Sequence, residues 1–353
     1  MEYKLEEFIT YEQPAKYIVE SDQYNDSYDI PVLTAGQTFI LGYTNEQDNI
    51  FDNLPVIIFD DFTTSVQYVD FPFKVKSSAM KLLKNTSKSN LKYCYYMLKY
   101  FQKQPENHKR QWISSTSQIK IDLPNIDNQS KIVEKLDFVQ EIIAKYKRQL
   151  NMLDELVKAR FVELFGTLDN PTFNYNKSTL GELCYKITDG KHGGCSLIQG
   201  SNRYFVGARE IYDDKVHYEN APEISVDDFE KDYRRCNVEV GDFLIVNTGA
   251  TIGKSAIATD KRTKHTLLQK SVALLKLNQD LLNPEFLKWC YRINTRMYLV
   301  ESSSAQPNLL LSKIKATEIY VPPIELQNQF ADFVKEVDKS RFIIKCMIKE
   351  GLL

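Results

Sequence analysis

The segment Ile119-Lys-Ile-Asp-Leu-Pro-Asn-Ile-Asp-Asn-Gln129 decides the fold, because the chain contains its pattern twice. The second copy, Thr317-Glu-Ile-Tyr-Val-Pro-Pro-Ile-Glu-Leu-Gln327, lies 198 positions further on. Each copy alternates apolar and polar residues, as strands do, and then places proline before an amphipathic stretch. The pattern therefore predicts a strand, a turn and a long helix at two places in one chain.

Shorter matches precede the two copies in one common order. Leu91-Lys-Tyr-Cys-Tyr-Tyr96 resembles Leu287-Lys-Trp-Cys-Tyr-Arg292, and Lys4-Leu-Glu-Glu-Phe8 resembles Thr179-Leu-Gly-Glu-Leu183. Serine-rich stretches, Ser114–Ser117 and Ser302–Ser304, follow the first of these pairs. Because all the matches keep one order, we predict two related domains, each followed by a helix.

The first long helix has apolar residues at steps of four and three, which is the a/d seam of a coiled coil. The seam consists of Ile132, Leu136, Val139, Ile143, Tyr146, Leu150, Leu153 and Val157. The second helix repeats it more weakly with Phe330, Val334, Val337, Ile344 and Ile348, and Arg341 interrupts it. We expect the two seams to pack against each other in antiparallel orientation; the alternative is that each helix caps its own domain.

Between the helices, short β-like runs alternate with polar turns, and each domain contains one further helical segment. The predicted fold class is mixed (α+β): two α/β domains separated by two long helices that form an antiparallel coiled coil, with a pseudo-two-fold internal repeat. The predicted boundaries are 1–125 for the first domain, 126–166 for the central helix, 167–324 for the second domain and 325–353 for the last helix.

The composition is that of a globular protein with more than one core: 353 residues, 43% hydrophobic and 26% charged. We expect a cytoplasmic protein without membrane contact, because no signal peptide or long apolar run is present. Six scattered cysteines and four histidines have no zinc-binding spacing, so no metal site is expected.

The charge is unevenly distributed along the chain. Residues 1–70 contain two lysines and fourteen acidic residues, whereas residues 71–121 contain eleven lysines or arginines and one acidic residue. A basic segment inside a folded domain is typical of a polyanion partner. A solvated lysine-rich surface explains the same pattern equally well.

The segment Asn247-Thr-Gly-Ala-Thr-Ile-Gly-Lys-Ser255 resembles a phosphate-binding loop, but its spacing is wrong. That loop requires four residues between its first glycine and the Gly-Lys pair, and only three separate Gly249 from Gly253. We therefore interpret the segment as a tight polar turn that carries a cation.

Taken together, the chain resembles the specificity (S) subunit of type I restriction-modification systems over nearly its whole length. The resemblance rests on the two helix-opening segments, on Val157-Lys-Ala-Arg-Phe-Val-Glu-Leu-Phe165, on Ile187-Thr-Asp-Gly-Lys-His192 and on the Asn247–Ser255 turn. It implies two target recognition domains that each read half of a bipartite double-stranded DNA site. It also implies helices that set the spacing and dock two methyltransferase subunits, with motor/nuclease subunits joining for cleavage. S-adenosylmethionine is then expected on the methyltransferase and no cofactor on this chain.

Under this resemblance, basic residues are expected to contact phosphates, and polar residues are expected to contact base edges. The phosphate candidates are Lys74, Lys76, Lys109, Arg110, Lys254, Lys261 and Arg262. The base-reading candidates are Thr34, Gln37, Lys191, His192, Arg209, Asn247, Thr248, Gln269 and Gln306. Thr188 is also expected among the DNA contacts. Glycines at 190, 193, 249 and 253 (Gly193 and Gly249 among the expected DNA contacts) allow a close approach of the backbone.

Two other functions compete with this interpretation. A nuclease or methyltransferase is disfavoured, because Val321-Pro-Pro-Ile324 lacks the polar and aromatic residues of a base-methylating motif and no G-x-G-x-x-G is present. A coiled-coil adaptor that binds no DNA remains an alternative, against which the basic segment and the repeated polar turns count. The sequence thus favours a DNA-reading subunit without catalytic residues.

Overall fold

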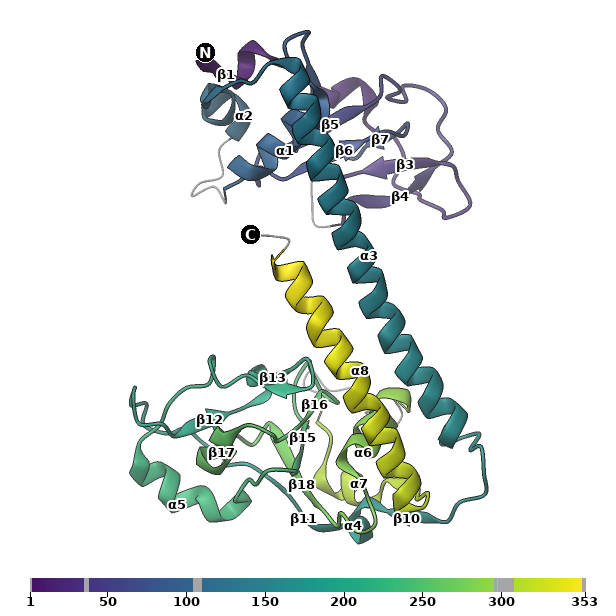
Figure 1. The fold of residues 1–353 in the computed structure, drawn as a ribbon, viewed down its shortest axis with the longest axis vertical. Coiled ribbons are helices and arrows are strands. Elements are labelled where there is room, and N and C mark those ends of the chain that lie inside the picture. Colours follow the sequence, from purple (N-terminus) through teal and green to yellow (C-terminus); the bar gives the residue numbers. More distant parts are fainter. Residues whose placement is uncertain (1, 35–37, 104–109, 295–296, 298–307, 351–353) are drawn as a thin grey trace. The chain divides into compact units, whose positions relative to one another are not determined.

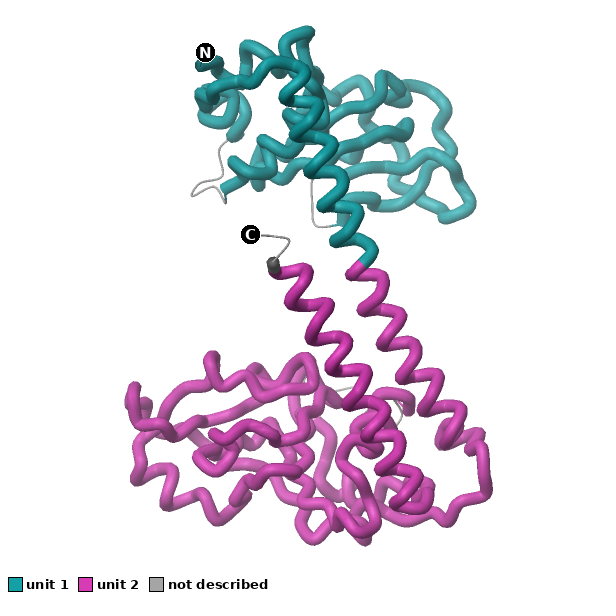
Figure 2. The backbone as a smooth tube through the Cα atoms, viewed as in Figure 1, with its two compact units in different colours: residues 1–145 teal, residues 146–353 magenta. Residues whose placement is uncertain are grey.

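The structure, a computed structural model, describes residues 2–34, 38–103, 110–294, 297 and 308–350. The chain consists of two compact units, residues 1–145 and 146–353 (Figure 2). One long helix, α3 (Ile126–Phe165), begins in the first unit and ends in the second (Figure 1). The predicted central helix is therefore confirmed, and its residues are shared between the units.

The first unit is built on two sheets. The four-stranded antiparallel sheet has the order β2 (Ile9–Glu12), β8 (Met80–Asn85), β5 (Val56–Asp60), β6 (Val66–Val69). The three-stranded sheet has the order β4 (Ile40–Thr44), β3 (Ile30–Leu33), β7 (Lys74–Val75), with β3 and β7 parallel. A separate pair joins β1 (Glu2–Lys4) to β9 (Lys120–Asp122). Helices α1 (Leu91–Phe101) and α2 (Gln111–Ser114) complete the unit, and Trp112 of α2 is buried in its core.

The second unit repeats this arrangement. Its four-stranded sheet has the order β11 (Cys184–Asp189), β18 (Val272–Leu277), β15 (Phe243–Val246), β16 (Ser255–Ile257). Strands β12 (Tyr204–Val206) and β17 (Thr266–Leu268) are parallel, β10 (Lys177–Thr179) pairs with β19 (Glu318–Tyr320), and β13 (Ile211–Tyr212) pairs with β14 (Lys215–Val216). The helices are α4 (Leu180–Leu183), α5 (Val226–Cys236), α6 (Pro284–Ile293), α7 (Leu311–Ala316) and α8 (Ile324–Glu350).

The internal repeat is visible in the strand order. In both four-stranded sheets the strand that comes first in the sequence lies at one edge and pairs with the strand that comes last. That last strand also pairs with the third strand of the order, β5 or β15, which in turn pairs with its successor in the sequence, β6 or β16. Each unit also contains one parallel strand pair, β3–β7 or β12–β17. The repeat predicted from short sequence matches therefore extends to the topology of both units.

Two glutamines show the repeat at atomic level. Gln129 is fully buried; its Oε1 accepts from the Asn90 backbone N–H (2.8 Å), and its Nε2 donates to the carbonyls of Lys88 (3.1 Å) and Pro124 (2.7 Å). Asn90 is the N-cap of α1, so the glutamine joins the start of α1 to the start of α3.

Gln327 makes the same three bonds in the second unit. It is fully buried, accepts from the Asn283 N–H (2.9 Å) and donates to the carbonyls of Leu281 (3.0 Å) and Pro322 (2.8 Å). Asn283 is the N-cap of α6. The glutamine that ends each copy of the deciding segment is therefore a buried clamp between two helix starts.

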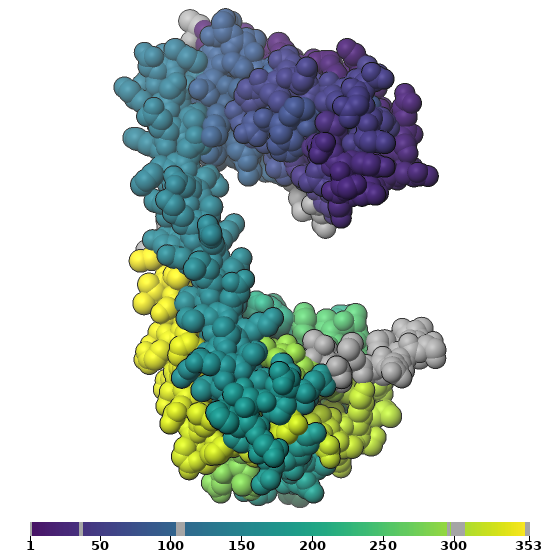
Figure 3. All heavy atoms as spheres, turned by 90° about the vertical axis from the view of Figure 1, so that its right-hand side faces the viewer, coloured from purple at the N-terminus to yellow at the C-terminus, as the bar shows by residue number. Residues whose placement is uncertain are grey.

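The coiled coil is antiparallel, as predicted, where its helices meet in the second unit. Phe161 and Phe165, near the end of α3, contact Phe330 near the start of α8 at ring distances of 5.4 and 5.6 Å. One turn or more earlier, α3 meets later residues of α8, since Asp154 pairs with Arg341. Figure 3 shows the yellow side chains of α8 packed along the later turns of α3. Each predicted seam residue of α3 is buried or half-buried.

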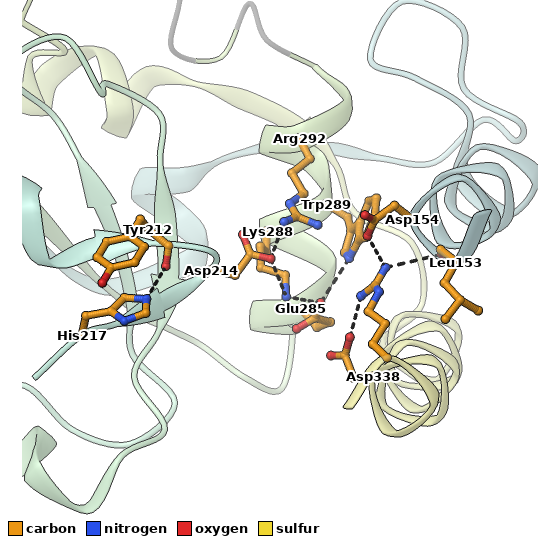
Figure 4. A network of polar contacts seen from close by, with 11 residues as sticks. Leu153, Asp154, Tyr212, Asp214, His217, Glu285, Lys288, Trp289, Arg292 and Asp338 are labelled. Atoms are coloured by element: carbon orange, nitrogen blue, oxygen red, sulfur yellow. Dashed lines mark hydrogen bonds and ion pairs between the residues drawn. The ribbon is translucent and has the colours of Figure 1, made fainter. Parts of the chain in front are cut away.

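Arg341 occupies the seam of α8, and it is accommodated by ion pairs with both helices. Its guanidinium donates to Asp154 (2.6 Å) and to Asp338 (2.5 Å), and its side chain is only 16% exposed (Figure 4). Its Nε atom is buried and has no hydrogen-bond partner among the described residues. A polar residue at a seam position lowers coiled-coil stability and specifies register.

The β13–β14 hairpin is attached to α6 by charge. Asp214, in the turn of the hairpin, pairs with Lys288 (3.8 Å) and with Arg292 (Figure 4). Glu285 accepts from Lys288 (2.5 Å) and from the indole N–H of Trp289 (3.1 Å). The network fixes an edge of the second unit against the helix that packs on α8.

Candidate nucleic-acid interface

Strand β11 ends in the turn Asp189-Gly-Lys-His192, which approaches the end of β17 very closely. A Cβ on Gly190 would lie 2.2 Å from the carbonyl oxygen of Leu268, so only glycine is accommodated there. The Lys191 N–H donates to that same carbonyl (2.7 Å). Gly193 follows with φ +99°, a conformation that favours glycine. Gly190 thus serves close backbone packing within the unit, whereas Gly193 serves the left-handed conformation of the turn.

Asp189 organises the polar side chains of this turn. The Arg235 guanidinium of α5 donates to its carboxylate and to its carbonyl oxygen (3.0 Å), and His192 Nε2 lies 3.0 Å from Oδ2. Burial alone would raise the pKa of Asp189, but the hydrogen bonds from Arg235 and His192 lower it below its ordinary value. The ionised carboxylate therefore holds His192, whose side chain is 62% exposed, in a fixed place.

Lys191 is directed away from solvent. Its ammonium pairs with Asp232 and lies 3.9 Å from Asp228, both on α5, and its side chain is 15% exposed. The hydrogen bond to Asp232 raises the pKa of Lys191. This lysine joins the turn to α5, and we do not retain it as a base reader. Thr188, inside β11, is half-buried, and its hydroxyl donates to the Asp189 carbonyl (3.3 Å).

The Asn247–Lys254 segment is the turn of a β-hairpin. It joins the antiparallel strands β15 and β16, and Gly249 (φ +97°) and Gly253 (φ +88°) adopt left-handed conformations. Gly-Lys-Ser leads into a strand, whereas a phosphate-binding loop leads into a helix whose N-terminus holds the phosphate. The turn is therefore no phosphate-binding loop, and Lys254 is exposed beside it.

The two turns lie together and form one open groove of about 370 Å³. A third segment, from Asn308 to Leu311, and Lys270 complete it; the lining residues are Asp189, His192, Asn247, Thr248, Lys270, Asn308, Leu309, Leu310 and Leu311. Asn247 is buried (4% exposed), whereas His192, Lys270 and Asn308 are exposed. The groove thus presents an imidazole, an ammonium, an amide and the Thr248 hydroxyl at one surface.

Hydrogen bonds of Asn247 hold the backbone of the hairpin turn against two neighbouring segments. The Asn247 N–H donates to the Ser271 carbonyl (3.0 Å), and its own carbonyl accepts from the Leu309 N–H (2.7 Å). The Thr248 hydroxyl lies 3.3 Å from Asn308 Oδ1. Side chains on such a rigid frame are suited to reading a ligand of fixed shape.

Lys270 and Asn308 were missed by sequence reasoning. Lys270 directly follows Gln269 and Asn308 lies near Gln306, both of which were predicted to read bases, but no motif distinguishes Lys270 or Asn308. Gln306 lies outside the described residues. Gln269 donates to the Phe205 carbonyl (3.4 Å) and packs on Gly207, so its amide is half-buried beside the groove.

The remaining candidates of the second unit lie outside this groove. Arg209 is exposed, and among the residues described it makes no ion pair with Glu210 or Asp213. Arg262 pairs with Asp260 (2.7 Å) and stacks over Tyr218 at 4.7 Å, in a different pocket. Lys261 is exposed next to it. Lys261 and Arg209 stay candidates for phosphate or base contact on exposure alone.

The candidates of the first unit are more engaged than their sequence indicated. Lys74 is 2% exposed; it pairs with Glu46 (2.7 Å) and donates to the Asp48 carbonyl (2.8 Å). Burial alone would raise the pKa of Glu46, but the bonds from Lys74 and from two backbone N–H groups lower it. Lys74 is therefore a structural ion-pair partner, and we do not retain it as a phosphate ligand.

Other first-unit candidates divide into three groups. Lys76 pairs with Asp22, and the Thr34 hydroxyl donates to the Thr38 carbonyl (2.7 Å). Arg110 is exposed at the start of α2. Gln37 and Lys109 lie outside the described residues.

Internal ion pairs account for part of the uneven charge distribution. Three lysines of residues 71–121 pair with acids of residues 1–70: Lys74 with Glu46, Lys76 with Asp22, and Lys81 with Asp61 (3.2 Å). The Lys81–Asp61 pair is almost completely buried. The basic segment is therefore not one continuous exposed surface, although Lys88, Lys99, Lys103, Arg110 and Lys120 are exposed.

In the described part of the chain, no helix combines the length and the apolar character that crossing a membrane requires. The same residues contain no group of three or more His, Cys, Asp or Glu side chains placed to hold a metal ion. All six cysteines are free thiols. The groove on the second unit is thus characterised by hydrogen-bonding and cationic side chains.

Comparison with known proteins identifies the family. The model of the type I restriction modification DNA specificity domain matches residues 1–154 and again residues 174–352. The EcoR124I/EcoR124II type I restriction enzyme specificity subunit of Escherichia coli is 50% identical over 161 residues, which are 42% of this chain and 40% of that relative. The alignment thus spans less than half of the relative's length.

A solved structure shares the fold across the whole chain. The S subunit of a type I restriction-modification system from M. genitalium superposes with a TM-score of 0.61 at 15% identity, covering 100% of this chain and 92% of that one. Similarity at this identity concerns the fold alone. Because the family model matches most of the chain, in two successive copies, the chain belongs to the type I restriction-modification DNA specificity family.

Proposed function

We propose that this chain is a DNA-reading specificity subunit whose two recognition domains each bind one half of a bipartite double-stranded site. The groove on the second unit carries the proposal, because two turns far apart in sequence meet there. It presents exposed His192, Lys270 and Asn308 on a rigid backbone frame. Imidazole, ammonium and amide groups are the side chains that recognise phosphates and base edges.

The helices act, in this proposal, as the element that determines spacing. An insertion of seven residues near Tyr146 lengthens α3 by about 10 Å and adds nearly two whole turns. That length corresponds to about three base pairs of B-DNA rise, so the gap between half-sites is expected to change while both half-sites persist. Exchange of residues 1–122 is expected to change one half-site only.

Exposed apolar side chains on the coiled coil support a role in docking partners. Met152 and Leu156 of α3 and Phe342, Ile343 and Met347 of α8 are 45–69% exposed. Surfaces of this kind are typical of protein interfaces. We propose that two methyltransferase subunits bind the coil and supply S-adenosylmethionine and catalysis, and that motor/nuclease subunits join in the complete cytoplasmic complex. The chain itself then contributes recognition without catalytic residues.

Binding of the purified chain to a duplex pool tests the proposal. We expect affinity to fall steeply as salt rises from 50 to about 200 mM, because phosphate contacts release counterions. A chain that binds no duplex at low salt, alone or with its methyltransferase, would exclude the DNA-reading function. The coiled-coil adaptor would then be the remaining interpretation.

A further inference from the structure

The groove of the second unit has a counterpart in the first unit that no sequence motif indicates. Strand β5 ends at Asp60 and is followed by Asp61, just as β15 ends at Val246 and is followed by Asn247. Both strands lie at the same position of equivalent sheets. The first residue of each following turn, Asp61 or Asn247, can therefore be compared directly.

Backbone hydrogen bonds establish that these two residues are equivalent. The Asp61 N–H donates to the carbonyl of Ala79 (3.1 Å), and the Asn247 N–H donates to that of Ser271 (3.0 Å). Ala79 and Ser271 each directly precede the last strand of the sheet, β8 or β18.

The acceptor side matches as well. The Asp61 carbonyl accepts from the Gln111 N–H (2.8 Å), and the Asn247 carbonyl accepts from the Leu309 N–H (2.7 Å). Gln111 and Leu309 are separated by 198 positions, the same shift that relates Gln129 to Gln327. Two independent backbone hydrogen bonds therefore show that the two turns, and the segments that pair with them, are equivalent.

Two residues that line the groove of the second unit have counterparts at the equivalent positions of the first unit. Phe62 follows Asp61 as Thr248 follows Asn247, and Arg110 precedes Gln111 as Asn308 precedes Leu309. Phe62 is 38% exposed, and Arg110 is exposed. Within the described residues the Arg110 guanidinium has no hydrogen bond or ion pair, so it is free to bind a ligand.

The turn that carries Phe62 is firmly built. Asp60 is 4% exposed; its carboxylate accepts from the Phe62 N–H (2.8 Å) and from the Thr63 hydroxyl (2.6 Å). The Thr64 hydroxyl donates to the Lys103 carbonyl (2.7 Å). An apolar side chain is thus held partly exposed by a polar frame, at the position that Thr248 occupies in the groove of the second unit.

We propose that Phe62 and Arg110 form the base-reading surface of the first recognition domain, and that Arg110 reads a guanine in its half-site. This inference rests on the proposed function. A guanidinium donates two hydrogen bonds to guanine O6 and N7 in the major groove, and an apolar side chain contacts the methyl group of thymine. The second unit offers the Asn308 amide at the equivalent place, which suits adenine. The two half-sites therefore differ in sequence.

Methylation mapping of variants tests this assignment. The full chain is co-expressed with the methyltransferase subunit of its own system in a host without DNA methylation, and modified bases are located by long-read sequencing. Arg110→Ala is expected to reduce the preference for guanine at one position of one half-site by roughly 5- to 150-fold, with the other half unchanged. Asn308→Ala is expected to relax the other half only.

Two further variants make the test decisive. Arg110→Lys keeps the charge but replaces the planar two-donor group with a single ammonium, so it is expected to retain affinity and to weaken the guanine preference less than Arg110→Ala does. Lys120→Ala removes an exposed charge from the same unit and leaves both half-sites as in the parent. If neither Arg110 variant changes either half-site while Asn308→Ala relaxes one, the assignment is wrong and the proposed function stands. A parent without any motif refutes both.

Discussion

The buried clamp of Gln327 gives the most quantitative prediction. Gln327→Ala removes three hydrogen bonds at 2.8–3.0 Å and leaves the Asn283 N–H and the carbonyls of Leu281 and Pro322 unpaired. Each bond contributes about 1 kcal/mol net, and unpaired buried groups cost more. We therefore expect the free energy of unfolding of the second unit to fall by about 3–5 kcal/mol.

Tryptophan fluorescence measures this loss in one unit at a time. The chain contains two tryptophans, Trp112 in the core of the first unit and Trp289 in the core of the second. With Trp112→Phe as background, denaturant unfolding reports on the second unit; with Trp289→Phe it reports on the first. Gln327→Ala is expected to lower only the Trp289 transition.

The matched control is Asn328→Ala. Asn328 is exposed and accepts one bond from the Asn283 side chain (2.8 Å), so its removal is expected to cost less than about 1 kcal/mol. Gln129→Ala is expected to reproduce the large loss in the first unit, because its bonds are equivalent. A loss for Gln327→Ala no larger than that for Asn328→Ala would refute the clamp.

Three more predictions concern the coil and the groove. Arg341→Leu is expected to stabilise the second unit by about 1 kcal/mol, because it fills a seam position and removes a buried unpaired Nε; a loss of 2 kcal/mol or more in the Trp289 transition would contradict this. The pKa of Asp189 lies below its ordinary value of 3.8, so its carboxylate stabilises the fold above that pH, and this contribution disappears as the pH falls toward the lowered value. Asp189→Asn is expected to flatten that part of the stability–pH curve, and an unchanged curve would rule the contribution out. Lys270→Gln is expected to reduce the slope of log affinity against log salt by about 1; an unaltered slope would exclude a phosphate contact there.

The repeat and the helices were predictable because their signals are local. A heptad seam is a property of consecutive residues, and all its predicted members on α3 are buried or half-buried. The Pro-x-Ile-x-x-Gln pattern marked both helix starts, although the reason for its glutamine became clear only from the bonds to Asn90 and Asn283. Arg341 was predicted to interrupt the seam. Its ion pair with Asp154 could not be predicted from the local sequence, because Asp154 lies on the partner helix.

The site was predictable only in part, because it depends on which segments meet. The two turns of the second unit were identified by their glycines and polar residues, and they do form one groove. Lys191 looked equally suitable, but acids on α5 neutralise it, and Lys74 is likewise buried against Glu46. The acidic partners Glu46 and Asp232 lie 28 and 41 positions away from these lysines and carry no common motif.

Phe62 and Arg110 show why the first unit was harder to interpret. Asp61 and Asn247 are 186 positions apart, whereas Arg110 and Asn308 are 198 apart, so no single shift of the sequence aligns the two sites. Loops of different length separate the equivalent strands, and the residue types differ at the compared site positions, Asp61 and Asn247, Phe62 and Thr248, Arg110 and Asn308. Only the shared backbone hydrogen bonds reveal the relationship.

Methylation mapping of the parent chain tests the central claim most directly. The chain is co-expressed with its methyltransferase subunit in a methylation-free host, and the modified sites are aligned to find their common sequence. Two readers on one chain predict a split motif, with two defined half-sites separated by a gap of fixed length. A single continuous motif, or methylation without sequence preference from a stable complex, would contradict the account.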